Sequence, residues 1–79
     1  MTHSKQQPIT FLYTNWKGET AKRTVIPKHI EFISTDWHPE PQWIMTAFDL
    51  DKQQDRGFAM KDMKQFDWSK LLIRVIPYK

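Results

Sequence analysis

The chain contains no cysteine, which excludes a disulfide framework, a thiolate zinc site and a cysteine nucleophile. Only two glycines and five prolines occur among its 79 residues, so the sequence is neither collagen-like nor of low complexity. No apolar run approaches the ~18 residues that cross a bilayer, and the opening residues MTHSKQQP lack the apolar segment of a secretory signal. We therefore expect a cytoplasmic protein without a membrane partner.

Aromatic residues, in contrast, are abundant: four Trp, two Tyr and five Phe, far too many for a disordered chain. A chain of this length forms one core. The polar residues 1–7 are predicted to be a flexible tail and residues 8–79 a single domain. The net charge of +3, from 12 basic and 9 acidic residues, permits a basic patch for nucleic-acid phosphate without requiring one.

Short stretches that alternate apolar and polar residues, separated by turn residues, are typical of strands. A tight turn is expected at Gly18, and Pro27, which cannot donate to a ladder, is expected to end the second strand. One helical turn is predicted over 61–66. The predicted strands cover residues 9–14, 20–27, 29–35, 42–50 and 56–60, with a final strand-like segment that closes the core within 66–79.

The stretch 42–50 is the most apolar in the chain, so we expect a central strand with Trp43 in the core. At its end, Asp49 and Asp51 are predicted to point into solvent beside Lys52. Together the segments predict an all-β protein, a small, strongly bent antiparallel sandwich or barrel. A barrel of the SH3/Sm-like type, with five to six strands, is favoured because it removes exposed sheet edges.

Catalytic and metal-binding patterns are absent from the sequence. There is no G-x-S-x-G motif and no phosphate-binding glycine loop. His3, His29 and His38 do not have the spacing of metal ligands. We expect neither an enzyme nor a cofactor.

Two arginines are the strongest candidates for ligand binding. Arg23 and Arg56 each alternate with apolar residues, and a guanidinium group can pair two oxygens of a phosphate or carboxylate at once. The alternative is that they form structural ion pairs with Asp49 or another acid. Tyr13 is expected either to present its hydroxyl beside them or to be a half-buried strand aromatic with its hydroxyl in water.

Two tryptophans are candidates for stacking against a base. Trp16 lies at the first predicted hairpin and Trp37 in a proline-containing loop, and such segments reach solvent. Stacking of a base on an aromatic ring contributes about 1–3 kcal/mol. The alternative is that these rings cap the open end of the barrel.

The order of these residues resembles the WYL domain family of bacterial and phage proteins. That family has an apolar strand ending in Tyr, a glycine hairpin, an Arg-x-Val-x-Pro strand, the Trp-Tyr-Leu tripeptide, a later Asp and an Arg-x-Phe segment. The matching positions are Tyr13, Gly18, Arg23, Val25, Pro27, Trp43-Ile44-Met45, Asp49, Arg56 and Phe58.

The resemblance implies an Sm-like barrel that usually accompanies a helix-turn-helix in transcription regulators, where it senses a ligand and nucleic acid or nucleotides are the suspected ligands. Nothing before Pro8 is long enough for a helix-turn-helix, so a stand-alone domain is expected. The tripeptide here lacks the central Tyr hydroxyl. Ala59 and Asp62 stand where the family usually has basic residues, while Lys61 and Lys64 supply charge nearby without bidentate geometry.

Two functions follow as expectations. The first is a non-catalytic binding module in which Arg23 and Arg56 hold the phosphate of a nucleotide or nucleic acid, flanked by Tyr13, Lys61 and Lys64. It requires that both guanidinium groups meet at one accessible mouth of the curled sheet. The alternative is a protein–protein interaction module that forms homo-oligomers or modulates a partner without a small ligand.

Overall fold

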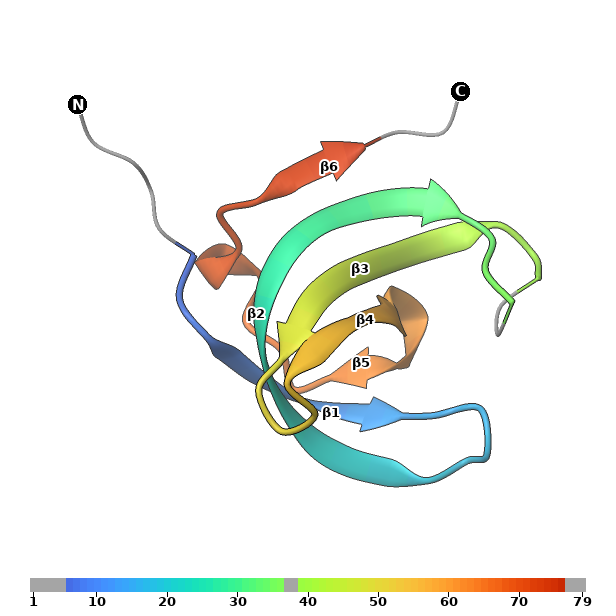
Figure 1. Ribbon diagram of the computed structural model, residues 1–79, viewed down its shortest axis with the longest axis horizontal. Coiled ribbons are helices and arrows are strands. Elements are labelled where there is room, and N and C mark those ends of the chain that lie inside the picture. The colour runs from blue at the N-terminus through green and yellow to red at the C-terminus, as the bar shows by residue number, and fades with distance from the viewer. Residues whose placement is uncertain (1–5, 37–38, 77–79) are drawn as a thin grey trace.

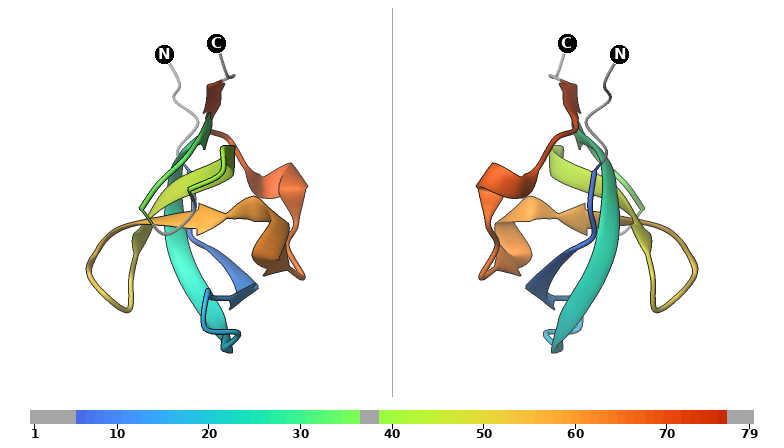
Figure 2. Two further views of the ribbon diagram at one scale, coloured as in Figure 1. Left: turned by 90° about the vertical axis from the view of Figure 1, so that its right-hand side faces the viewer. Right: turned by 90° about the vertical axis from the view of Figure 1, so that its left-hand side faces the viewer.

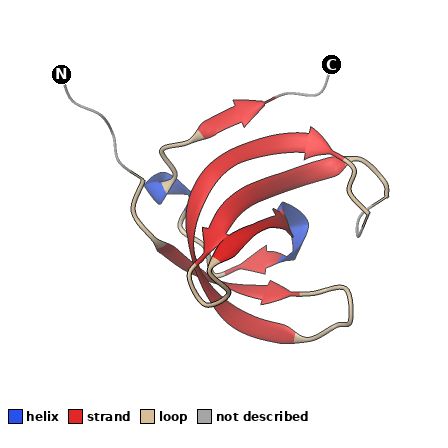
Figure 3. Ribbon diagram, in the orientation of Figure 1, coloured by secondary structure: helices blue, strands red, loops and turns tan. Residues whose placement is uncertain are grey.

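The computed structural model describes residues 6–36 and 39–76, and within them six strands form one sheet (Figure 1). The sheet order is β4-β3-β2-β1-β5, and β6 adds beside β2. Two short 3-10 helices, η1 and η2, lie between strands (Figure 3). The elements are β1 (Ile9–Thr14), β2 (Thr20–Ile33), β3 (Gln42–Asp49), β4 (Gln54–Ala59), η1 (Met60–Asp62), β5 (Met63–Lys64), η2 (Trp68–Lys70) and β6 (Arg74–Ile76).

The prediction of a small all-β protein with hardly any helix is confirmed. Every ladder is antiparallel except the one between β2 and β6, which is parallel. The sheet curls strongly, and β2 sweeps around the molecule as its longest strand (Figures 1 and 2). Among the described residues no ladder joins β4 to β5, so the curled sheet has a gap between these strands.

The prediction that Pro27 ends a strand is wrong. β2 continues through it, pairing first with β1 and then with β3. The register with β3 shifts between Pro27 and His29, which leaves Lys28 as the extra residue of a bulge. A bulge accommodates a residue without an N–H donor and bends the strand. The bend lets one strand serve both halves of the sheet.

The alternation predicted for β1 determines which of its residues lie in the core. Ile9, Phe11 and Tyr13 are buried, whereas Thr10 is exposed. The ring of Phe58, on β4, packs edge-on against Phe11 and Tyr13, with centroid distances of 5.4 Å and 5.0 Å. Opposite ends of the sheet are therefore held together through aromatic packing. The core cluster consists of Ile9, Phe11, Tyr13, Val25, Ile30, Met45, Ala47, Phe58 and Met63.

The structure corrects the predicted burial of Trp43 and the predicted extent of the helical turn. Trp43 is 41% exposed instead of lying in the core. It stands near the start of β3, opposite Phe32, and its ring packs edge-on against that residue at a centroid distance of 5.2 Å. The helical turn occupies only Met60–Asp62 and is followed by the two-residue strand β5.

The C-terminal segment closes the core only in part. Leu71 and Ile73 pack against the core, while Leu72 and Val75 are exposed. An apolar groove of about 290 Å³ results at this end of the molecule, lined by Ile30, Trp43, Met60, Trp68 and Val75. None of the helices in the described ranges is long and apolar enough to cross a membrane.

Candidate functional site

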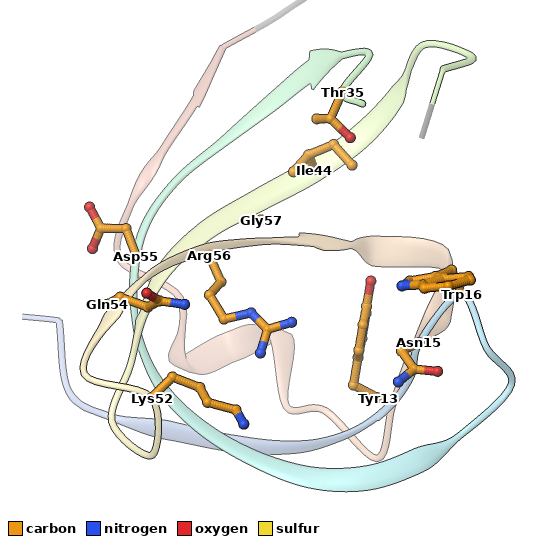
Figure 4. Close-up of a pocket in the computed structure, with 10 residues that line it drawn as sticks. All are labelled: Tyr13, Asn15, Trp16, Thr35, Ile44, Lys52, Gln54, Asp55, Arg56 and Gly57. Carbon is orange, nitrogen blue, oxygen red and sulfur yellow. The ribbon is translucent and has the colours of Figure 1, made fainter. Parts of the chain in front are cut away.

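A cavity of about 600 Å³ lies where the end of β1 faces β4 across the opening in the sheet (Figure 4). In Figure 4, Arg56 reaches from β4 toward Tyr13, Lys52 points into the same space from the turn before β4, and Trp16 stands on the opposite side. Charged, polar and aromatic groups thus meet in one hollow. The lining residues are Tyr13, Asn15, Trp16, Thr35, Ile44, Lys52, Gln54, Asp55, Arg56 and Gly57.

The hairpin between β1 and β2 holds Trp16 at the cavity. Gly18 has φ of +83°, a conformation that glycine adopts without strain. Asn15 closes the turn, because its side-chain Oδ1 accepts the N–H groups of Lys17 and Glu19, both at 2.9 Å. Trp16 is 64% exposed, and the Nζ of Lys17 lies 5.3 Å from its ring centroid. The expected placement of Trp16 at a solvent-reaching hairpin is what the structure shows.

Asp49 is fully buried, so the prediction that it points into solvent is wrong. Its Oδ1 accepts the N–H groups of Asp51 at 2.9 Å and Lys52 at 3.2 Å, which fixes the turn between β3 and β4. Asp51 itself is exposed, as predicted. The buried carboxylate therefore positions the turn that carries Lys52 into the cavity.

Arg56 is the cation that both the sequence and the cavity single out. Its Nη1 lies 3.6 Å from Oδ2 of Asp49, and its side chain is 32% exposed. This distance is too long for a hydrogen bond. Within the described residues the guanidinium group donates no hydrogen bond, although arginine carries five N–H donors. Asp49 is the acid that the alternative interpretation named, yet its pairing leaves the donors of Arg56 open to a ligand.

Arg23 lies on the same face of the sheet but does not line the cavity. Cross-strand partners share a face; Arg23 is opposite Phe11 and Arg56 is opposite Ala47, and both partners belong to the core. The Nε of Arg23 is buried and has no hydrogen-bond partner in the described structure. The structure therefore brings both arginines to one face and only Arg56 to the opening, so the expectation that both guanidinium groups meet at one accessible mouth is not met.

Tyr13 joins the two sides of the gap. Its hydroxyl oxygen accepts the N–H of Ala59 at 3.0 Å. The ring is only 6% exposed, so the alternative of a half-buried ring with its hydroxyl in water is wrong. Burial raises the pKa of Tyr13, and the hydrogen bond from Ala59, the nearby Asp62 carboxylate and the two arginines modify that shift, with Asp62 raising it and the others lowering it.

The remaining predicted residues lie elsewhere. Lys61 and Lys64 are exposed and do not line the cavity, and the Nζ of Lys61 lies 3.5 Å from the carboxylate of Asp62. Trp37 lies outside the described residues, as do His3 and His38. In the described ranges no cluster of three or more potential metal ligands occurs.

Several lining residues were missed by the sequence interpretation, above all Lys52, Gln54 and Asn15. Asn15 and Lys52 occupy hairpin turns and Gln54 begins β4 directly after one, so their signal was the turn chemistry around them. Asp55 also lines the cavity, but its carboxylate binds Lys28 at 2.8 Å. The acid at the rim is therefore paired by a lysine from outside the cavity, while Lys52 and Arg56 remain as its cations.

Comparison with known proteins found no matching family model, no matching curated protein and no matching solved structure. The function has to be inferred from the cavity itself. Its cations and its exposed aromatic ring favour an anionic ligand. They offer no nucleophile held by a base.

Proposed function

We propose that this protein is a non-catalytic binding module that takes an anionic ligand, the phosphate of a nucleotide or nucleic acid, in the cavity between β1 and β4. The observation that carries the proposal is the guanidinium group of Arg56, which lines the cavity and faces Asp49 at 3.6 Å, a distance that leaves its N–H donors without a hydrogen bond to the described residues. Lys52 adds a second cation, and Trp16 offers a ring for stacking.

The proposal assigns the chain to a WYL-like module with a ligand-sensing, regulatory role. The curled sheet is then an SH3/Sm-like barrel that remains open between β4 and β5. The departures from the family's basic pattern at Ala59 and Asp62 are offset by Lys52, which supplies a cation from a different turn. In this assignment Arg23 supports the site by adding positive charge behind Tyr13.

Arg56→Ala tests the anion site directly. A hydrogen bond to a charged group contributes about 1.5–3 kcal/mol, so the variant is expected to bind a labelled nucleotide or single-stranded oligonucleotide at least about tenfold more weakly. Fluorescence anisotropy at low and moderate salt measures this loss. Lys64→Ala removes the same charge outside the cavity and is expected to change the affinity little.

Equal losses in Arg56→Ala and Lys64→Ala would mean that binding is diffuse attraction to the net charge, and the proposal would fail. Arg56→Lys refines the test, because lysine keeps the charge but not the planar fork. An intermediate affinity is expected for this variant.

Interaction with a protein partner is the second candidate function. A separate observation favours it: the edge of β4 that borders the cavity has no paired strand among the described residues. An open strand edge is a template for another chain.

A further inference from the structure

The free edge of β4 directs backbone groups into the gap of the sheet. In an antiparallel ladder, the peptide groups of alternate residues point toward the partner strand and those of the intervening residues point away. Ala59 pairs with Ile44 of β3 but donates its N–H in the other direction, to Tyr13. Gly57 and Asp55 have the same parity, so their N–H and C=O groups also point away from β3.

These backbone groups border the cavity. Gly57 lines it, and a residue without a side chain can do so only with main-chain atoms. Asp55 lines it as well, one alternation earlier along the same edge. Main-chain atoms of Gly57 therefore form part of one wall, and the parity of Asp55 directs its N–H and C=O to the same side of β4. Unpaired main-chain groups along a strand edge are what an extended chain recognises.

The cavity reaches around this edge to both faces of the sheet. A Cβ atom at Gly57 would lie 3.1 Å from Cγ2 of Ile44, so Ile44 occupies the face that a side chain at position 57 would take. Arg56, the neighbouring residue, points to the opposite face. One side of the edge thus presents the cations Arg56 and Lys52. The other side carries Thr35, the nearly buried Ile44 and Asp55, whose charge is paired with Lys28.

We propose that the cavity receives an extended segment of a partner protein as an added strand on β4. Its backbone pairs with Asp55 and Gly57, an acidic side chain faces Arg56 and Lys52, and the flanking side chains, which are apolar, face Ile44. A strand alternates its side chains between two faces, which matches the alternation of charge across this edge. Main-chain hydrogen bonds supply affinity and the side-chain sites supply specificity.

The added strand extends the sheet from β4 into the opening between β4 and β5, on the side where the cavity faces the end of β1. This inference deepens the protein-interaction function and does not depend on nucleotide binding. Because both ligands use Arg56, an anion in the cavity and the partner strand exclude each other. Such competition is a direct way for a sensor module to release a partner when its ligand arrives.

A blocked peptide, acetyl-Val-Glu-Val-Glu-Val-amide, is the first probe. Titrated into the full chain and followed by heteronuclear NMR, it is expected to shift the amide signals of Asp55 and Gly57 and to slow the exchange of their hydrogens. The same peptide with alternate amides N-methylated keeps its charge but cannot pair with the edge, and it is expected to lose these effects. Equal binding by both peptides, or shifts confined to residues outside β4, would overturn the proposal.

Two variants at one position give a matched test from the side of the protein. Gly57→Pro removes the free N–H, whereas Gly57→Ala keeps it; both introduce the same Cβ against Ile44. Because this N–H points away from β3, proline is tolerated there. Gly57→Pro is expected to bind the peptide about fivefold more weakly than Gly57→Ala; equal affinities would contradict the assigned strand.

Nucleotide binding is measured separately on the same variants. Gly57→Pro is expected to leave the nucleotide affinity at the level of Gly57→Ala, because phosphate contacts come from side chains. Peptide binding without nucleotide binding would therefore remove the first proposed function and keep this inference, and the reverse result would do the opposite.

Discussion

At the scale of single residues, Asp49 is the group on which the cavity depends most. Its carboxylate has no exposed surface, holds two N–H groups of the turn and faces Arg56. Asp49→Ala is expected to lower the free energy of unfolding by about 2–3 kcal/mol, because both hydrogen bonds to a charged acceptor are lost. Urea denaturation measures this.

Asp51→Asn is the matched control for that variant, since Asp51 is exposed in the same turn; it is expected to stay within about 0.5 kcal/mol of the parent. Asp49→Asn keeps one acceptor oxygen but loses the charge that faces Arg56. A cost between those of the other two variants is expected. If Asp49→Ala were as stable as the parent, the turn between β3 and β4 would not depend on the hydrogen bonds to Asp49.

Tyr13 predicts a pH dependence. Burial raises its pKa above the ordinary value of 10.0, so the folded state keeps the phenol proton more tightly than the unfolded state does. The resulting stabilisation is complete below the unfolded-state pKa and is lost as the pH rises through the folded-state pKa. Stability is therefore expected to fall above about pH 10.

Tyr13→Phe checks this account. It removes the hydrogen bond from Ala59 and is expected to cost about 1 kcal/mol at neutral pH, while its stability should fall less steeply above the ordinary pKa of the phenol. Tyr78→Phe removes the other phenol of the chain and is the control. An equal alkaline loss in both variants would place the titrating group elsewhere.

The sequence was informative about residues wherever alternation and turn chemistry agree. Arg56, Tyr13 and Trp16 were identified because each follows a regular pattern, and all three line the cavity. Asp49 is predicted in solvent because it ends a strand beside a polar turn, although it shares the parity of Met45 and Ala47, which are buried. Alternation gives the face of a residue; it does not show whether that face is covered.

At the scale of elements, the hairpin between β1 and β2 gives a direct test. Gly18 has a positive φ and open space where a Cβ would stand. In Gly18→Ala the added methyl group meets no neighbouring atom, so the variant is destabilised only by the left-handed backbone conformation. We expect it to lower the free energy of unfolding by about 1–2 kcal/mol. Urea denaturation measures it, with Gly18→Asn as the control that tolerates this conformation.

An unchanged stability in Gly18→Ala would mean that the hairpin relaxes to a different turn. In that case Trp16 would move, and its fluorescence would change together with the cavity. The conformation of the turn and the position of the Trp16 ring are linked because Asn15, the residue before Trp16, accepts the N–H groups of Lys17 and Glu19 on either side of Gly18.

β2 shows what local patterns cannot give. The sequence favours a break at Pro27, since proline interrupts a ladder, but the bulge at Lys28 absorbs the missing donor and the strand continues. Whether a proline ends a strand depends on the partner strand, which lies far away in the sequence. The same limit applies to β6: its residues alone do not indicate that it pairs with β2, or that the pairing is parallel.

At the scale of the whole molecule, the sheet's gap connects fold and function. The sequence supports an all-β fold with strongly bent strands, and the structure has it. That the curl stops short of a closed barrel depends on the brevity of β5, which pairs with β1 over only two residues. The opening that remains between β4 and β5 leaves the edge of β4 without a paired strand among the described residues, and the cavity of both proposed functions borders that edge.

The ion pair between Lys28 and Asp55 stands beside that free edge, and it has a consequence for how the protein behaves when concentrated. Charges at a sheet edge discourage identical molecules from stacking into fibrils. Asp55→Asn is therefore expected to shorten the storage life of concentrated solutions, seen as rising light scattering and thioflavin fluorescence, while Asp51→Asn should store as well as the parent. A strand edge proposed to pair with a partner needs such protection against pairing with identical molecules.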